Sequence, residues 1–372
     1  MKPDRTFHHQ NLSWARLRRG LHQAELANLI GVSTRSIKGY EGATYAPALE
    51  PLRRLAKVLK FPEGFFFADT IGDIKQEAVS FRAGSNLPAR VRDMALGSAA
   101  VAIAFNREAE RYFALPEEKL PDYSGRNPER AAELLRGRWD LGAQPIAALL
   151  PLLEEKGIRI FSLPSDVSNA GTFSLWHGRT PFIFLKSGQS LEATRADLAY
   201  ELGHLVLHRS GEPASKLAHE EARNLAEAFM LPAGVMRELN DFSDLTQLLQ
   251  SVAHFGVTPM LVVRRLRRAG VLSEWKFRER RMALTQLAGT DTHVGAAWPE
   301  TSTALTRIFS SLRARGITKH KFAHVLGIHP KELDDLTFSV ATKIGDQVDT
   351  TEIGAHELRP GLRLVSQHAE KE

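Results

Sequence analysis

Strand-forming patterns occupy one short part of this 372-residue chain, and helical periodicity fills most of the remainder. Residues 158–163 alternate apolar and polar side chains, and two runs rich in aromatic and β-branched residues follow at 172–177 and 181–186. Gly178, Arg179 and Thr180 separate these two runs as a turn. The sequence therefore predicts an α+β protein that is mainly α, with a small three-stranded β-sheet near the middle of the chain.

The chain is long enough for two or three domains, since a domain commonly takes about 100–200 residues. A stretch rich in proline, glycine and acidic residues at 116–128 indicates one boundary. In chain order we expect an N-terminal helical domain (1–69), a linker with a long helix (70–126), a domain that contains the sheet (127–240), a helical C-terminal domain (241–342), and a loose tail without periodicity (343–372).

The composition limits which cross-links and metal sites the chain can form. Cysteine is absent, so the chain can form no disulfide and no cysteine-based zinc site, and any metal must bind His, Asp or Glu. The net charge of +6 is concentrated in residues 1–69, which hold 11 Lys and Arg against 6 Asp and Glu. Such a basic module is typical of a protein that binds nucleic-acid phosphates. An ordinary solvated surface with a modest excess of basic residues is the alternative.

The sequence shows no membrane or targeting element. The N-terminus lacks an apolar signal core. The longest apolar run, near residues 99–105, falls short of the ~20 residues of a membrane span. We therefore expect a cytoplasmic protein with no membrane partner.

The basic N-terminal module has the pattern of five short helices. Periodicity and capping residues predict helices at 11–18, 23–30, 34–41 and 49–59, with an aromatic-rich final turn at 61–67. Ala27 is small enough for two helices to approach, Gly31 permits a tight turn, and Ser33 can cap the next helix. In this frame the third helix lies across the DNA major groove with its N-terminal side chains on base edges.

The residues expected on the exposed face of the third helix are Thr34, Arg35, Ser36 and Lys38. Arg35 can pair with a guanine through two hydrogen bonds, and Gln23, at the start of the preceding helix, can contact a phosphate. Gly39 is unusual here, because glycine in a helix costs about 1 kcal/mol relative to alanine. It either allows a close approach to the backbone or marks a frayed helix end.

The segment from Leu12 to Leu59 resembles the XRE-type, lambda-repressor-like helix-turn-helix domain. The residues that carry the resemblance are Leu17-Arg18, Gln23–Ala27, Gly31–Ser33, Ile37, Tyr40–Gly42 and Pro47. The resemblance implies a lambda-repressor-like five-helix fold that binds double-stranded DNA at an operator, as a homodimer on a two-fold site.

The pattern of residues 21–40 recurs at 317–336, where Ala is again followed by Gly four residues later. The second copy carries Lys331-Glu332 and Asp334-Asp335, which make a poor surface for DNA phosphates. We expect it to serve packing or dimerisation.

A second motif lies on the helix predicted at 191–208. It reads Tyr200-Glu201-Leu202-Gly203-His204 and is followed by His208 and, on the next predicted helix, by Glu221. With Arg195–Ala199 and Phe229–Pro232, these residues resemble the ImmA/IrrE family of zinc-dependent peptidases, whose motif is H-E-x-x-H. The resemblance implies a zincin-like domain with a short sheet before the motif helix. It also implies zinc as cofactor, Glu201 as general base, and His204 and Glu221 as metal ligands.

The sequence departs from this family at the first ligand, because Tyr200 stands where the family has His. A neutral phenol with a pKa of about 10 is a poor zinc ligand at pH 7, and two remaining ligands predict weak binding.

Three interpretations stay open. The domain is a degenerate peptidase that now acts as a sensor or interaction module. Alternatively, a metal binds with Tyr200 or water in the first position and some activity survives. In the third, His208 replaces the missing ligand, since His204 and His208 are also four residues apart. His219 is expected to be exposed.

The sequence as a whole predicts a DNA-binding transcriptional regulator with a degenerate ImmA/IrrE-like domain. One alternative is an active zinc metallo-endopeptidase that cleaves a repressor. Another is a toxin–antitoxin or phage-control component that acts through a protein partner.

Overall fold

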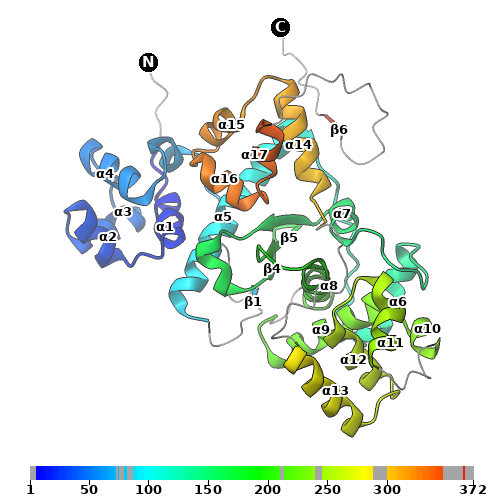
Figure 1. Ribbon diagram of the computed structural model, residues 1–372. Helices are drawn as coiled ribbons and strands as arrows, with labels where there is room; N and C mark the ends of the chain where they lie inside the picture. The colour runs from blue at the N-terminus through cyan, green and yellow to red at the C-terminus, as the bar shows by residue number, and fades with distance from the viewer. Residues whose placement is uncertain are drawn as a thin grey trace.

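Helices surround one small β-sheet in this protein (Figure 1). The computed structural model describes residues 6–72, 74, 79–81, 87–209, 213–238, 245–287, 300–346 and 363–364. None of the helices in these ranges has the length and apolar character that a membrane-spanning segment needs. The mainly α, α+β class predicted from the sequence is confirmed.

The N-terminal module has the five helical elements predicted from its spacing. They are α1 (His9–Arg18), α2 (Gln23–Ile30), α3 (Thr34–Glu41), α4 (Leu49–Leu59) and the 3-10 helix η1 (Glu63–Phe67). Gly31 ends α2 in the left-handed conformation, with φ at 68°, which favours glycine. Ser33 caps α3, because its hydroxyl accepts a hydrogen bond of 3.0 Å from the backbone N–H of Ser36.

The long helix α5 (Ala89–Tyr112) packs against α1. A Cβ atom on Gly97 would lie 2.5 Å from the backbone nitrogen of Arg18, so glycine is needed where the two helices cross. After α5, the short strand β2 (Phe113–Ala114) pairs with β6 (Arg363–Leu364).

The central sheet has four strands in the order β1-β4-β5-β3. The predicted strands are present as β3 (Arg159–Ser162), β4 (Phe173–His177) and β5 (Thr180–Leu185). Strands β4 and β5 form the expected antiparallel hairpin, and β3 runs parallel to β5. The prediction of three strands missed β1 (Ser80–Phe81), which pairs antiparallel with β4. Two residues are too few to show an alternating pattern, so the sequence could not reveal this strand.

The remaining helices follow the predicted order, with additions. They are α6 (Pro128–Arg138), α7 (Leu149–Glu155), α8 (Leu191–Leu207), α9 (Lys216–Met230), α10 (Ala233–Glu238), α11 (Leu245–Val252), α12 (Pro259–Arg268), α13 (Glu274–Leu287), α14 (Thr303–Ala314), α15 (Lys319–Val325), α16 (Pro330–Leu336) and α17 (Val340–Asp346). Helices α10, α13 and α17 were not predicted. Helix α17 extends to Asp346, past the expected start of the tail at 343, and most of that tail lies outside the described residues.

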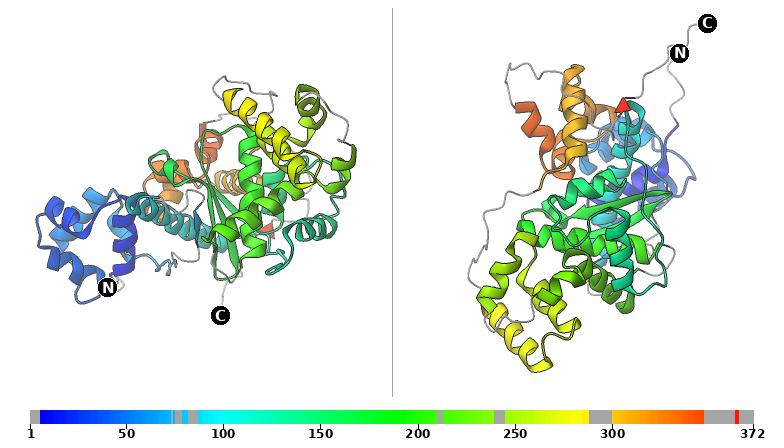
Figure 2. Two further views of the ribbon diagram at one scale, coloured as in Figure 1. Left: turned by 90° about the horizontal axis from the view of Figure 1, so that it is seen from below. Right: turned by 90° about the vertical axis from the view of Figure 1, so that its right-hand side faces the viewer.

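The sheet separates two hydrophobic cores. One face contributes Phe161, Phe173 and Phe184 to a core shared with the N-terminal module, α5 and the helices α14–α17. The other face contributes Ile160 and Ile183 to a core shared with α6–α9 and α11–α13. The N-terminal module therefore lies at one end of the molecule, and α10–α13 lie at the opposite end (Figure 2).

Candidate functional sites

The predicted DNA-reading face of α3 is open. Arg35 and Lys38 are exposed and Thr34 is half-buried, whereas Ile37 on the opposite side is buried in the module. Arg35 forms no hydrogen bond or ion pair with any residue that the structure describes. The Ser36 hydroxyl lies 2.9 Å from the Ser33 hydroxyl, so part of its bonding capacity serves the helix cap.

Gln23 is held in place by a charged pair inside the module. Its side-chain amide donates a hydrogen bond of 2.7 Å to Glu41, and the guanidinium of Arg16 donates to both oxygens of that carboxylate, at 2.6 and 3.0 Å. This network fixes the start of α2 relative to the end of α3. A phosphate contact by Gln23 remains a prediction, and its amide nitrogen donates to Glu41 in this structure.

Gly39 has a structural explanation. A Cβ atom at this position would lie 2.6 Å from the ring of Tyr45, which folds back onto the helix. The ring of Tyr45 also meets Tyr40 edge-on, with centroids 5.4 Å apart. Glycine at position 39 therefore leaves room for the ring of Tyr45, within a helix that continues to Glu41.

The second candidate site is formed where α8 crosses α9. Gly203 of α8 lies against the backbone of Ala222 in α9, and a Cβ atom there would be 2.7 Å from the Ala222 carbonyl oxygen. Only glycine allows this approach without displacing the helix. As a result, the motif residues of α8 face side chains from the first turns of α9.

Tyr200 contacts His219, a residue that was expected to be exposed. Its hydroxyl lies 2.6 Å from Nδ1 of His219. Burial lowers the pKa of His219, and the nearby charge of Arg223 lowers it further. The expectation that His219 is exposed was wrong. It is half-buried because it lies one residue from Ala218 and three from Ala222, on the buried side of α9.

His204 and His208 form a second linked group. Nδ1 of His204 lies 3.3 Å from Nδ1 of His208, whose Nε2 lies 2.9 Å from a carboxylate oxygen of Glu221. Burial lowers the pKa of His204 well below its usual value, and His208 and His219 lower it further. Nε2 of His204 and Nε2 of His219 are buried with no hydrogen-bond partner among the described residues.

Glu201, the predicted general base, faces a different part of the domain. Its side chain is fully buried, and it accepts a hydrogen bond of 2.6 Å from the hydroxyl of Ser174 on β4. No sequence pattern indicated Ser174, because a serine within a short aromatic strand has no motif around it.

The side chains at the family's zinc positions do not fit a zinc ion. Zinc in proteins takes about four ligands at ~2.0–2.3 Å around one point. Here Tyr200 is hydrogen-bonded to His219 and Glu221 lies against His208, whereas Nε2 of the third position, His204, has no partner. Within the described ranges, no group of three or more His, Asp or Glu residues is arranged to hold a metal ion.

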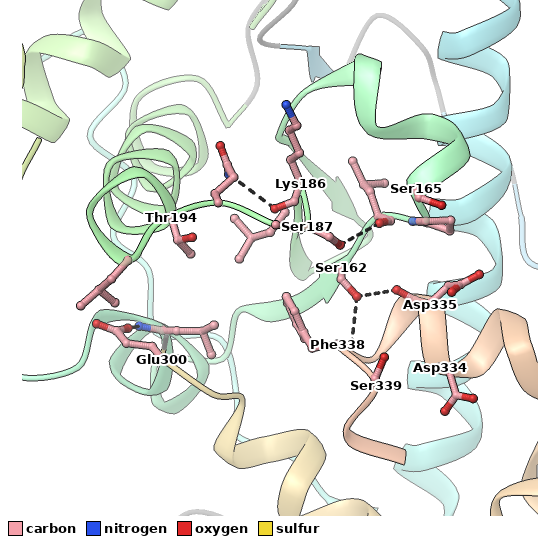
Figure 3. A pocket seen from close by; sticks show the side chains of 17 residues that line it. Ser162, Ser165, Lys186, Ser187, Thr194, Glu300, Asp334, Asp335, Phe338 and Ser339 are labelled. Carbon is pink, nitrogen blue, oxygen red and sulfur yellow. Dashed lines mark hydrogen bonds between the residues drawn. The ribbon is translucent and has the colours of Figure 1, made fainter. Parts of the chain in front are cut away.

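A cavity of about 370 Å³ opens at the carboxyl ends of the parallel strands β3 and β5 (Figure 3). The start of α8, the end of α16 and Glu300 line it as well. Ser162 at the end of β3 donates a hydrogen bond of 2.5 Å to the carbonyl of Asp335 and accepts one of 2.9 Å from the N–H of Phe338. The sheet is thereby bonded directly to the end of α16.

Helix α16 also holds the N-terminal module. Arg18 is 2% exposed and pairs with Glu332 at 3.0 Å and with Asp166 at 2.9 Å. Arg19 pairs with the other oxygen of Glu332 at 2.5 Å. The turn before α16 packs on the same module, since a Cβ atom on Gly327 would lie 2.9 Å from Cα of Phe65. The helix pair at 317–336 thus packs on the N-terminal module at the end of α1 and at η1.

These features define a class of protein: a helix-turn-helix module with an open third helix, joined to a domain in which helices α8 and α9 pack on one face of a small sheet. Comparison with protein families agrees. Residues 12–66 match the family described as helix-turn-helix, and residues 153–267 match the family described as IrrE N-terminal-like domain. The chain is therefore a fusion of these two domain types. Searches of the curated proteins and of the solved structures found no match.

Proposed function

We propose that this protein is a sequence-specific transcriptional regulator whose IrrE-like domain has lost its peptidase chemistry and acts as a sensor or interaction module. The exposed Arg35 and Lys38 on α3 support the DNA-binding part. The match of residues 12–66 to the helix-turn-helix family supports it too.

The loss of peptidase chemistry rests on one observation, the hydrogen bond of 2.6 Å between the Tyr200 hydroxyl and Nδ1 of His219. A histidine in the first ligand position would offer a lone pair to a metal, whereas this phenol is hydrogen-bonded to a neighbouring imidazole. Ionising a phenol at pH 7 works against its ordinary pKa of about 10. The family's first ligand has therefore been replaced by a group that stabilises the contact between α8 and α9.

The sensor role is supported by the connection between the domains. The cavity at the end of the sheet contacts α16 through Asp335. One turn earlier, Glu332 of the same helix binds Arg18 and Arg19 of the N-terminal module. A ligand or partner that moved α16 would therefore act on the module that binds DNA.

Metal analysis of the purified full chain tests the proposal. We expect zinc well below one equivalent after dialysis, and no proteolysis. Tyr200→His should raise zinc affinity, whereas Tyr200→Phe, the matched control without a ligand atom, should not.

The alternative function, a zinc endopeptidase, makes the opposite prediction. Near-stoichiometric zinc in the wild-type protein, with proteolysis abolished by Glu201→Gln, would establish it. If Tyr200→His binds no more zinc than the wild type, Tyr200 is not what altered the site.

A further inference from the structure

A second cavity, of about 730 Å³, lies between the N-terminal module and helix α16. The end of α4 and the residues that follow it, 56–62, line the cavity on the module side, and the start of α16 lines it on the other. Small-molecule sites in proteins commonly have volumes of about 300–1,000 Å³, so an organic ligand fits this space. We call this cavity the module–α16 cleft.

The module–α16 cleft carries more positive than negative charge. The cationic side chains in its lining are Arg18, Arg19, Lys57, Lys60 and Lys331. The lining also holds three carboxylates, and each of them is paired with Arg18, Arg19 or Lys331. The ammonium groups of Lys57 and Lys60 are exposed and form no ion pair with any residue that the structure describes. The cleft therefore has an excess of two positive charges, which an anionic ligand would compensate.

Lys60 occupies a backbone position that favours glycine. It ends α4 in the left-handed conformation, with φ at 54°. Helix α2 ends in the same conformation at a glycine, Gly31. A residue with a Cβ atom is sterically unfavourable there, so the turn itself does not explain a lysine at position 60. Its side chain instead adds a positive charge to the lining of the module–α16 cleft.

Arg19 holds the lysine-bearing side of the cleft in place. Its Nε donates a hydrogen bond of 2.6 Å to the carbonyl of Leu59, and a second guanidinium nitrogen donates one of 3.3 Å to the carbonyl of Lys60. The guanidinium also lies 5.0 Å from the ring centroid of Phe61 and pairs with Glu332 of α16. The two sides of the cleft are therefore joined through Arg19 before any ligand binds.

We propose that the module–α16 cleft binds a small phosphate ester. The phosphate contacts Lys57, Lys60 and Lys331, and the organic part lies against Phe61 and Pro62. A phosphate monoester carries a charge of about −1.5 to −2 at pH 7, which matches the excess of two positive charges, whereas a monocarboxylate supplies only one negative charge. Lysine ammonium groups bind phosphate oxygens as point charges.

The ligand links the module to α16. Lys57 and Lys60 belong to the module and Lys331 belongs to α16, so a phosphate between them replaces a like-charge repulsion by two attractions. Lys331 is available for this contact because its side chain is 73% exposed, and its ion pair with Asp335 contributes little in water. Binding therefore stabilises the docking of the module on the body. Any effect on DNA binding rests on the proposed function, whereas the binding itself does not.

Calorimetric titration of the full chain with phenyl phosphate, without DNA, tests the inference. In about 0.15 M salt, which screens exposed charges beyond ~8 Å, one equivalent should bind. Lys57→Gln and Lys60→Gly should each weaken binding by about tenfold, because each removes one charged hydrogen bond. Lys60→Gly should also preserve or raise the free energy of unfolding, since glycine suits the backbone there. The matched controls Lys216→Gln and Lys321→Gln, at exposed lysines outside the cleft, should bind like the wild type.

Four results overturn the inference. They are no saturable binding of phenyl phosphate, equal weakening in the cleft and control variants, equally tight binding of benzoate, and unchanged affinity in both Lys57→Gln and Lys60→Gly. Equal weakening in the controls would identify an adventitious ion only.

Hydrogen exchange tests the link between the module and α16. Phenyl phosphate should slow exchange in α1 and α16 and leave α8 and α9 unchanged, and faster exchange in α1 contradicts the link. Because no DNA is present, failure of these experiments leaves the proposed function standing. Failure of the chain to select any DNA duplex contradicts the proposed function and leaves the ligand site standing.

Discussion

Arg35 presents a free guanidinium on the outer face of α3, in the position from which such helices reach base edges. Arg35→Ala should weaken binding to a duplex that the full chain selects from a random pool by about 1–3 kcal/mol. It should leave binding to unrelated DNA nearly unchanged. Titration of both duplexes at one salt concentration measures the difference. Arg130→Ala, at an exposed arginine of α6, is the control and should change neither. An equal loss on both duplexes would assign Arg35 to a phosphate contact.

Tyr200 contributes through its hydroxyl. Tyr200→Phe keeps the ring in its buried place but leaves Nδ1 of His219 without its hydrogen-bond partner. A buried polar group that loses its partner costs about 1–3 kcal/mol, so the free energy of unfolding in urea should fall by that amount. Tyr123→Phe, at a half-buried tyrosine outside this cluster, is the control. Equal small effects in both variants would show that the hydrogen bond contributes little.

The crossing of α8 and α9 depends on Gly203. Gly203→Ala places a methyl group 2.7 Å from a backbone oxygen that cannot move alone, so the helices must separate. Overpacking of this kind costs about 1–3 kcal/mol of stability. Gly137→Ala in α6 has open space around the new methyl and should be neutral or stabilising by up to ~1 kcal/mol. Chemical denaturation of the two variants gives the comparison, and similar losses would rule out the helix contact as the cause.

Local elements of the fold could be predicted because their signals are local. The bounds of α2, α3 and α4 were predicted to the residue. Gly31 marks the end of α2, and Ser33 marks the start of α3. Strand β1 and the helix α13 were missed. A two-residue strand forms only by pairing with β4, and the apolar residues of α13 include the exposed Trp275 and Met282, which obscure its buried face.

The candidate site was predictable along α8 but not across to its neighbours. The H-E-x-x-H spacing identified Tyr200, Glu201 and His204, and also their departure from the family. It could not show that Tyr200 contacts His219 or that Glu201 contacts Ser174. The two residues of each pair lie on different elements and are 19 and 27 positions apart in the sequence. Gly203 was the available signal for the first, since a glycine within a helix often marks a close approach.

At the scale of the molecule, the helix-turn-helix module and the C-terminal helices form one body on one face of the sheet, and the IrrE-like helices form another on the opposite face. Ser162 at the end of β3 joins the sheet to α16 by hydrogen bonds, whereas the ion pair of Arg18 with Glu332 lies within the first body. Because each body has its own core, loss of this ion pair should loosen the first body more than the second.

Glu332 is the charge on which the docking of the DNA-binding module depends. Its carboxylate pairs with both Arg18 and Arg19, and Arg18 is almost fully buried. Glu332→Gln leaves a buried guanidinium poorly compensated, which costs about 3–5 kcal/mol. Hydrogen exchange should therefore show faster exchange in α1 and α16, while α8 and α9, in the other core, stay protected. Asp166→Asn removes a partner that is 49% exposed and should have a much smaller effect. If the two variants loosened α1 equally, burial of the pair would not be what holds the module to the body.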